Sequence, residues 1–363
     1  MFLRKILGII RKNKLYAVLV VFIILINTAV FVGKESDESI EEPTVVQQQV
    51  EEKPAPQEEK DYYSDEASKE REKRIEELAK TDPRLYFFVA VLNLFILFVI
   101  FMGLLLDGYF LGRWLRRKPL DIGTNRPESA KWTVADVVRV TLIFLSFGYV
   151  FVILQAMIAR WIPILKNENF RMVFDTAMMN VVGISVIFYF IVKKYRQSIN
   201  AIGLTLKGFA KNVFYAMIGY VTLVPILLGI MLVTYFVIKW FAYEPPVQPI
   251  VEIFMKEKEP TILLMSTLFA AIFGPIAEEI FFRGFMYGAI KKTFGIFWAM
   301  IITSAVFSIL HTHVVGFLPI MMLGLLLAFL YEKTGSLISC MSVHIAHNIG
   351  MVILVFLARS IGT

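Results

Sequence analysis

Long apolar stretches, each with few or no charges, constrain the fold of this chain more than any other feature. A helix needs about 20 apolar residues to cross the hydrocarbon core of a bilayer, and several stretches are about that long. Of the 363 residues, 57% are hydrophobic and 18% are charged, whereas soluble domains average about 45–50% and about 25%. The sequence therefore predicts an all-α fold, a polytopic transmembrane helical bundle of about eight or nine spans. The candidate spans are Leu15–Val32, Leu85–Leu111, Val137–Ala159, Met172–Val192, Val213–Phe241, Thr261–Ile290, Thr293–Leu310, Phe317–Tyr331 and Leu337–Leu357.

The net charge of +7 comes from short basic clusters beside the apolar spans, so it does not indicate a nucleic-acid partner. Basic residues concentrate in cytoplasmic loops, and five of them precede the first span, which predicts a cytoplasmic N-terminus. Residues 34–84 instead hold 17 Asp/Glu and 9 Lys/Arg, as expected of an extracytoplasmic loop. Their composition is too polar to bury a core, so we expect a largely disordered segment.

The stretch GPIAEEIFFRGF, residues 274–285, places three formal charges inside an apolar run. Hydrocarbon penalises each by roughly 2.5–3.5 kcal/mol, and intramembrane ionisable residues are therefore functional by default. Glu279 and Arg283 are four residues apart, so on a helix they share a face and form a structural ion pair. Glu278 is turned about 100° away, which leaves it without a local partner and free to act as a working carboxylate. The alternative is an ion-pair network that only joins helices.

Two further polar groups follow on later spans. His311 ends the segment FSILH, and a carboxylate and an imidazole together can hold a water molecule and remove its proton. His344 and Asn348 in HIAHN are four residues apart, and their N–H groups form a donor pair suited to a developing oxyanion. Taken singly, these residues could equally be interhelical hydrogen-bonding groups, which are common for His and Asn in membranes.

The three segments together resemble the CPBP family, which contains the CAAX proteases and bacteriocin-processing intramembrane proteases. EEIFFR matches its EExxxR motif, FSILH matches FxxxH, and HIAHN matches HxxxN, in the same order. The resemblance covers roughly residues 261–358 and implies an intramembrane endopeptidase. It assigns Glu278 and His311 to water activation and assigns His344 and Asn348 to the oxyanion.

The resemblance also suggests a division of the chain. Residues 1–33 would be a cytoplasmic N-terminus and first transmembrane anchor, and residues 34–84 the polar extracytoplasmic loop. Residues 85–212 would be accessory transmembrane helices with cytoplasmic loops, and residues 213–358 the CPBP-like protease core. We expect an integral protein of a bacterial inner membrane that acts on a membrane-associated or prenylated protein or peptide.

The sequence leaves the cofactor open. Glu278, His311 and His344 are a credible set of zinc ligands, because catalytic zinc takes three N/O ligands and keeps one position open. The chain has no HExxH motif, however, and direct activation of water by Glu and His needs no metal. Either no cofactor or a divalent metal such as zinc fits the pattern.

Two other classes of function compete with the protease. A proton-coupled transporter would also use buried Glu and His, but it would spread polar groups over both halves of the chain. Outside the last third, only Asp107, Asp175 and Asn180 are candidates for such groups. A catalytically silent immunity or scaffold protein on the same fold would have lost a motif residue, whereas all motif positions are present here.

Overall fold

The computed structural model describes residues 18–25, 27, 73, 80–118, 129–241, 243, 248–311 and 315–362. These residues are helical with short connections, and no strand occurs among them. The elements lie in the order α4 (Pro83–Leu115), α5 (Val134–Ile158), α6 (Glu168–Phe188), α7 (Phe209–Phe241), α8 (Pro249–Lys256), α9 (Pro260–Leu268), α10 (Gly274–Glu279), α11 (Gly288–Leu310), α12 (Phe317–Thr334) and α13 (Leu337–Gly362). Three π-helical segments, Tyr189–Lys194, Phe269–Phe273 and Ile280–Tyr287, and two 3₁₀ turns, Pro163–Lys166 and Ile199–Ile202, complete the list.

Seven helical runs in the described part are long and apolar enough to cross a membrane, which confirms the polytopic helical bundle. The sequence predicted eight or nine spans, and two features account for the difference. The candidate spans Thr261–Ile290 and Thr293–Leu310 form one helical run of 51 residues, Pro260–Leu310. Half of the first candidate, Leu15–Val32, lies outside the described residues, as does most of the loop 34–84.

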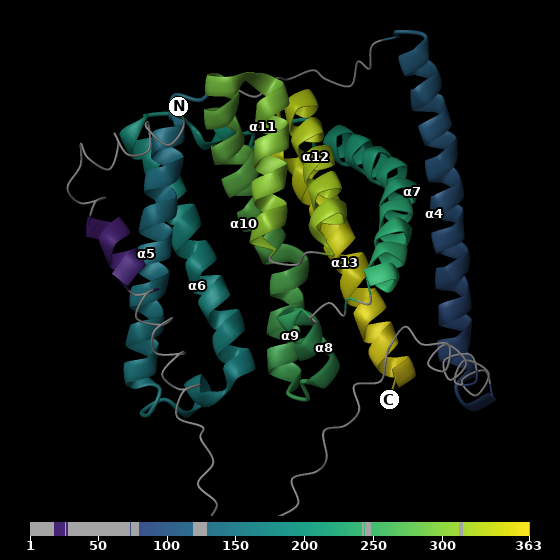
Figure 1. Ribbon diagram of the computed structural model, residues 1–363, viewed down its shortest axis with the longest axis horizontal. Helices are drawn as coiled ribbons and strands as arrows, with labels where there is room; N and C mark the ends of the chain where they lie inside the picture. Colours follow the sequence, from purple (N-terminus) through teal and green to yellow (C-terminus); the bar gives the residue numbers. More distant parts are fainter. Residues whose placement is uncertain are drawn as a thin grey trace, which may run out of the picture.

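The long run changes direction at Gly295, whose φ of 84° interrupts α11. That backbone conformation is open to glycine and strained for other residues. After the break, α11 returns into the bundle and ends near its mid-height, where α12 begins (Figure 1). This reversal lets a histidine at the end of α11 lie deep inside the bundle.

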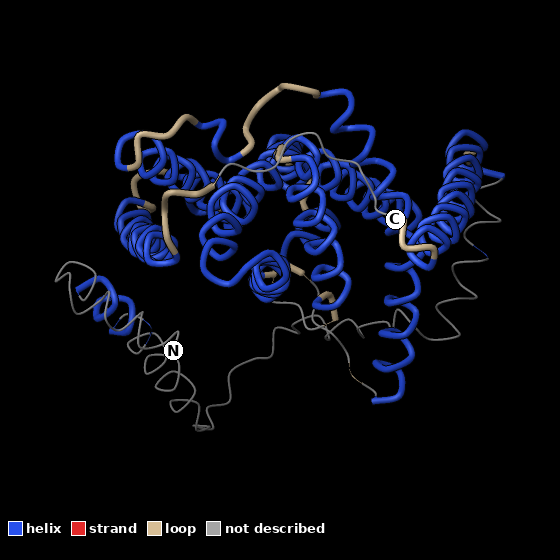
Figure 2. The backbone as a smooth tube through the Cα atoms, turned by 90° about the horizontal axis from the view of Figure 1, so that it is seen from above, coloured by secondary structure: helices blue, strands red, loops and turns tan. Residues whose placement is uncertain are grey.

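The C-terminal helices form the centre of the molecule, with α5 and α6 on one side and α7 and α4 on the other (Figures 1 and 2). Large side chains that are fully buried concentrate in the central helices, whereas α4 is apolar but exposed along most of its length. α4 contacts α7 closely at Gly103, where a Cβ atom would lie 2.5 Å from the carbonyl oxygen of Val221. Pro225 bends α7 at this contact, because proline removes a helical hydrogen bond.

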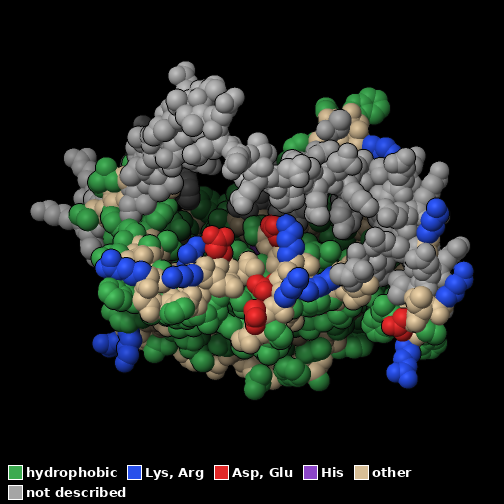
Figure 3. All heavy atoms as spheres, turned by 90° about the horizontal axis from the view of Figure 1, so that it is seen from below, with side chains coloured by type: hydrophobic (Ala, Val, Ile, Leu, Met, Phe, Trp, Pro, Cys, Tyr) green, Lys and Arg blue, Asp and Glu red, His purple; other side chains and the backbone are tan. Residues whose placement is uncertain are grey.

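The short helix α8 closes the end of the bundle seen in Figure 3, where charged side chains of both signs gather among apolar ones. Phe254 of α8 is buried, and its carbonyl oxygen accepts a hydrogen bond from Arg359 at 2.8 Å. The Asn169 amide donates to Glu257 at 2.7 Å and lowers the pKa of that carboxyl. Contacts to both α13 and the start of α6 therefore hold α8 in place.

The start of α5 is joined to the central π segment by Trp132. Its indole N–H donates to the carbonyl oxygen of Phe285 at 2.7 Å, and the two rings stack with centroids 5.4 Å apart. Trp132 is buried, and a Cβ atom on Gly288 would approach Ala130 to 3.0 Å, so the two segments are in close contact. The accessory helices thus pack directly on the segment that follows the buried glutamates.

We expect Trp132→Phe to lower the stability of the detergent-solubilised protein. The substitution keeps an aromatic ring beside Phe285 but removes the hydrogen bond, which is worth about 1 kcal/mol. Trp161→Phe is the matched control, because Trp161 is 72% exposed and its replacement should change the unfolding free energy by at most about 0.5 kcal/mol. Thermal unfolding of both variants measures the difference, and equal midpoints would contradict the role of the Trp132–Phe285 bond.

Candidate active site

The first element of the site is a helix interrupted on both sides by π-helical segments. Gly274 donates its backbone N–H to the carbonyl oxygen of Phe269, five residues earlier. If this spacing continued, the N–H of residue 275 would donate to the carbonyl oxygen of Ala270. Residue 275 is proline and has no N–H, which leaves the Ala270 carbonyl oxygen without that partner. The Asn348 amide donates to this oxygen at 2.7 Å. Asn348 therefore has a structural contact, and its second amide hydrogen stays available.

A buried charged network lies one turn further along. Arg283 Nη1 is 2.7 Å from Glu279 Oε1, and both side chains are fully buried. His344 Nδ1 is 2.8 Å from the same Glu279 oxygen, and Arg283 Nη2 donates to the Gly324 carbonyl oxygen at 3.2 Å. The guanidinium carbon lies 4.6 Å from the centroid of the Phe307 ring. Glu279 thus contacts α13 as well as its own helix, and Arg283 contacts α12.

Glu278 differs from its neighbour in both exposure and partners. Its side chain is 34% exposed, and its Oε2 atom lies 3.7 Å from His344 Nε2. That separation is too long for a direct hydrogen bond. Within the described residues, the buried Oε2 atom has no hydrogen-bond partner. A water molecule beside both atoms could hydrogen-bond to each, because the carboxylate accepts and the imidazole can donate or accept.

His311 caps the end of α11, and its orientation is fixed by Phe307. His311 Nδ1 is 2.7 Å from the Phe307 carbonyl oxygen, so this nitrogen carries the hydrogen and Nε2 is left to face other groups. The Phe307 ring packs against both imidazoles, with centroid distances of 4.6 Å to His311 and 5.5 Å to His344. Phe307 therefore brings the histidines of two motifs to one place, whereas His313 lies outside the described residues.

The structure does not assemble the possible zinc ligands into one group. Among the residues that it describes, no set of three His, Cys, Asp or Glu side chains is placed to hold a metal ion. Glu278 and His344 approach each other, but no such group of ligands includes His311.

Two polar groups near the site were not assigned a role from the sequence. The Tyr220 hydroxyl of α7 hydrogen-bonds to His347 Nδ1 at 3.1 Å. The two rings are nearly perpendicular, in a T-shaped arrangement with centroids 5.9 Å apart. His347 thus contacts α7. The sequence offers no local signal for this pair, because 127 residues separate its members.

Comparison with known proteins agrees with the motifs. The sequence model of the family "Type II CAAX prenyl endopeptidase Rce1-like" matches residues 260–350. The match covers 91 of the 363 residues, and this region is similar to that family. The matched residues include Glu278, His311, His344 and Asn348, while α4 to α7 lie outside them.

A curated protein of Bacillus subtilis (strain 168) shows the same relationship. It is named "Putative membrane peptidase YdiL" and is 33% identical over 95 residues, which is 26% of this chain and 37% of that protein. No solved structure matches the chain. The comparisons therefore concern the Rce1-like region, and the chain spans little more than a third of the length of the curated relative.

We expect Arg283→Met to lower stability strongly, because it leaves Glu279 buried beside a single histidine. Removing one partner of a buried ion pair costs about 3–5 kcal/mol. Lys256→Met is a matched control, since Lys256 and Glu252 have the same i,i+4 spacing and a similar distance of 2.6 Å, but are 75% and 53% exposed. The control should change the unfolding free energy by at most about 1 kcal/mol.

Thermal unfolding in one detergent compares the two variants. The double variant Arg283→Met/Glu279→Gln should recover part of the loss, because it no longer contains an unpaired buried charge. Equal effects of Arg283→Met and Lys256→Met would show that burial does not strengthen the pair.

Proposed function

We propose that this protein is an intramembrane endopeptidase that hydrolyses a peptide bond of a membrane-associated or prenylated protein or peptide. The observation that carries the proposal is the unpartnered oxygen of Glu278, which lies beside His344 in an Rce1-like region. Burying a carboxylate without a partner is unfavourable, and such groups mark functional sites in membranes. In a peptidase, this oxygen could accept a proton from the water molecule that attacks the peptide bond.

In the proposed mechanism, Glu278 and His311 hold a water molecule at the scissile carbonyl. Glu278 takes a proton from the water molecule while the water oxygen forms a bond to the carbonyl carbon. The carbonyl oxygen then becomes an oxyanion. When the C–N bond breaks, the same proton passes to the leaving amine nitrogen. General acid–base catalysis of this kind contributes typically about 10²–10⁴-fold.

His344 and Asn348 are proposed to stabilise the oxyanion. His344 Nδ1 faces the Glu279 carboxylate, so it donates there, and a second proton on Nε2 would be directed toward the reacting group beside Glu278. Asn348 uses one amide hydrogen for Ala270 and has another for the oxyanion. Both donors are fixed by bonds to other elements, as preorganised stabilisation of developing charge requires.

The surroundings support a membrane substrate. The site lies among helices that are long and apolar enough to span a bilayer, which favours a substrate that reaches it from the membrane. The basic residues before the first candidate span favour a cytoplasmic N-terminus, and we propose a bacterial inner membrane as the location.

We expect Glu278→Gln to abolish proteolysis while the protein remains inserted and folded. The amide is nearly isosteric with the carboxylate but cannot accept the proton from water. Peptide termini in membranes can be profiled with wild type and with this variant, and cleavage products should disappear in the variant. Persistence of those products would contradict the assignment of Glu278.

Asp175→Asn is the matched control for this experiment. Asp175 is another carboxylate on a spanning helix, in α6, and its buried Oδ1 atom has no partner among the described residues. The same change of charge there should leave proteolysis unaffected. Loss of cleavage in both variants would show that the effect is not specific to Glu278. If expression of the wild type produces no new peptide termini, the protease proposal is contradicted, and a catalytically silent protein or a transporter is favoured.

Asn348→Ala should lower kcat by roughly 10²–10³-fold on a peptide identified by that profiling, with little change in KM. The expected loss is that of one oxyanion donor, which binds charge present only in the transition state. A purely structural role through Ala270 would lower the unfolding midpoint without a selective effect on kcat. Both quantities are therefore measured on the same preparation.

The same assay tests the metal alternative. With water activated directly by Glu278, 1,10-phenanthroline should leave turnover unchanged. Inactivation by the chelator that added zinc reverses, together with bound metal that is lost in His344→Ala, would contradict the metal-free mechanism.

A further inference from the structure

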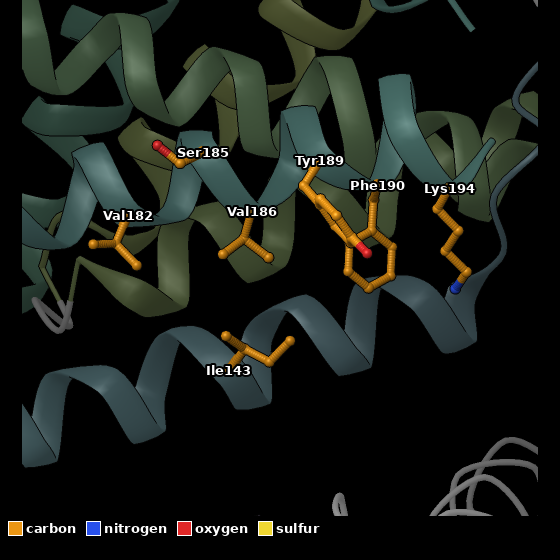
Figure 4. A pocket seen from close by; sticks show the side chains of 7 residues that line it. All are labelled: Ile143, Val182, Ser185, Val186, Tyr189, Phe190 and Lys194. Atoms are coloured by element: carbon orange, nitrogen blue, oxygen red, sulfur yellow. The ribbon is translucent and has the colours of Figure 1, made fainter. Parts of the chain in front are cut away.

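A pocket of about 550 Å³ lies between α5 and α6, away from the candidate active site. Figure 4 shows Val182 and Val186 of α6 and Phe190 of the following π segment directed toward Ile143 of α5, whereas Ser185 points away from Ile143. Val182, Val186 and Phe190 form most of the apolar wall. The pocket is lined by two helical runs that are suited to span a membrane, so lipid chains would lie beside it in a bilayer.

One end of this pocket is basic. Lys194 lines it, and its Nζ atom lies 2.5 Å from Asp136 Oδ1. Asp136 also binds Arg139 at 3.1 Å, one helical turn before Ile143 on α5. Two cations therefore surround one buried carboxylate, and exposed Lys193 adds a further positive charge nearby. The pocket thus combines an apolar body with an end that carries a net positive charge.

We propose that this pocket binds an anionic phospholipid of the membrane. One acyl chain would lie along the wall formed by Val182, Val186 and Phe190, with the phosphate at Lys194. The apolar wall matches a chain, for which each buried CH₂ contributes about 0.8 kcal/mol. Basic pockets between transmembrane helices on the cytoplasmic side are suited to anionic headgroups, and α5 and α6 meet at the end that the basic residues assign to the cytoplasm.

The depth of the Lys194 side chain explains why a headgroup could reach it. The side chain is 35% exposed, and its ammonium lies 4.5 Å from the centroid of the Phe190 ring. A lysine ammonium carries three donors, and Asp136 uses one of them, so phosphate oxygens can accept from the others. Phe190 in turn meets Phe285 edge-on at 6.4 Å, which brings the pocket wall into contact with the π segment after Glu279.

This inference does not depend on peptidase activity, because it is tested by binding. The purified full-length protein is titrated with phosphatidylglycerol or phosphatidylcholine of identical acyl chains, and bound lipid is measured by native mass spectrometry. Lys194 and Arg139 with Asp136 give one net positive charge even before Lys193 is counted. Each basic residue near an anionic surface is worth about 1 kcal/mol, so phosphatidylglycerol should bind at least about fivefold more tightly. The preference should shrink as the salt concentration rises.

Two tryptophan variants locate the binding site. Val186→Trp fills the pocket, because Val186 lines it and points toward Ile143, and should weaken binding of phosphatidylglycerol at least about tenfold. Val181→Trp is the control, because Val181 is 59% exposed on the same helix and does not line the pocket. It should bind like wild type.

Unchanged binding in Val186→Trp would overturn the assignment to this pocket. Val182→Trp, on the same wall, repeats this test if Val186→Trp does not fold. Equal affinity of wild type for the two lipids would overturn the role of Lys194 and its neighbours.

Discussion

The structure depends on keeping the charges of Glu279 and Arg283 inside an apolar bundle. Their mutual contact at 2.7 Å neutralises the pair, but each also needs partners from other helices. Glu279 obtains one from His344 of α13, and Arg283 obtains one from the Gly324 carbonyl of α12. Because buried charges are stable only when they are paired and hydrogen-bonded, this network fixes three helices around one point. Glu278 is the adjacent residue, and the same network determines where its free oxygen lies.

A second constraint is the irregular backbone on both sides of the glutamates. In hydrocarbon, an unsatisfied carbonyl is expensive, so a departure from the α-helix requires donors from elsewhere. Asn348 supplies one to Ala270, where Pro275 has no N–H, and Trp132 supplies one to Phe285. Irregular helices often occur at functional sites. Here they tie the backbone on either side of the carboxylates, at Ala270 and Phe285, to residues 78 and 153 positions away in the sequence.

The helices outside the Rce1-like region contribute to this arrangement rather than merely surrounding it. Trp132 and Phe190 both contact Phe285, which follows Arg283 by two residues in the same π segment. Asp136 joins the start of α5 to the end of α6 through Thr133, Lys194 and Tyr195. A perturbation where the start of α5 meets Lys194 and Tyr195 therefore has a short path of packed side chains to the site.

The sequence by itself determined the all-α membrane architecture, because apolar stretches of span length have few other stable folds in water or lipid. It also determined that Glu279 and Arg283 meet, since residues four apart are neighbours on any helix. It could not predict that two candidate spans form the single helical run Pro260–Leu310 with a break at Gly295, because that depends on the backbone conformation of this glycine. Nor could it predict the hydrogen bond between His344 and Glu279 or the one that Asn348 donates to the Ala270 carbonyl oxygen. The contacts of the Phe307 ring with both histidines were equally unpredictable. Only the tertiary structure decided these, because they join residues of different helices, and helical periodicity specifies which face a residue lies on but not what packs against that face.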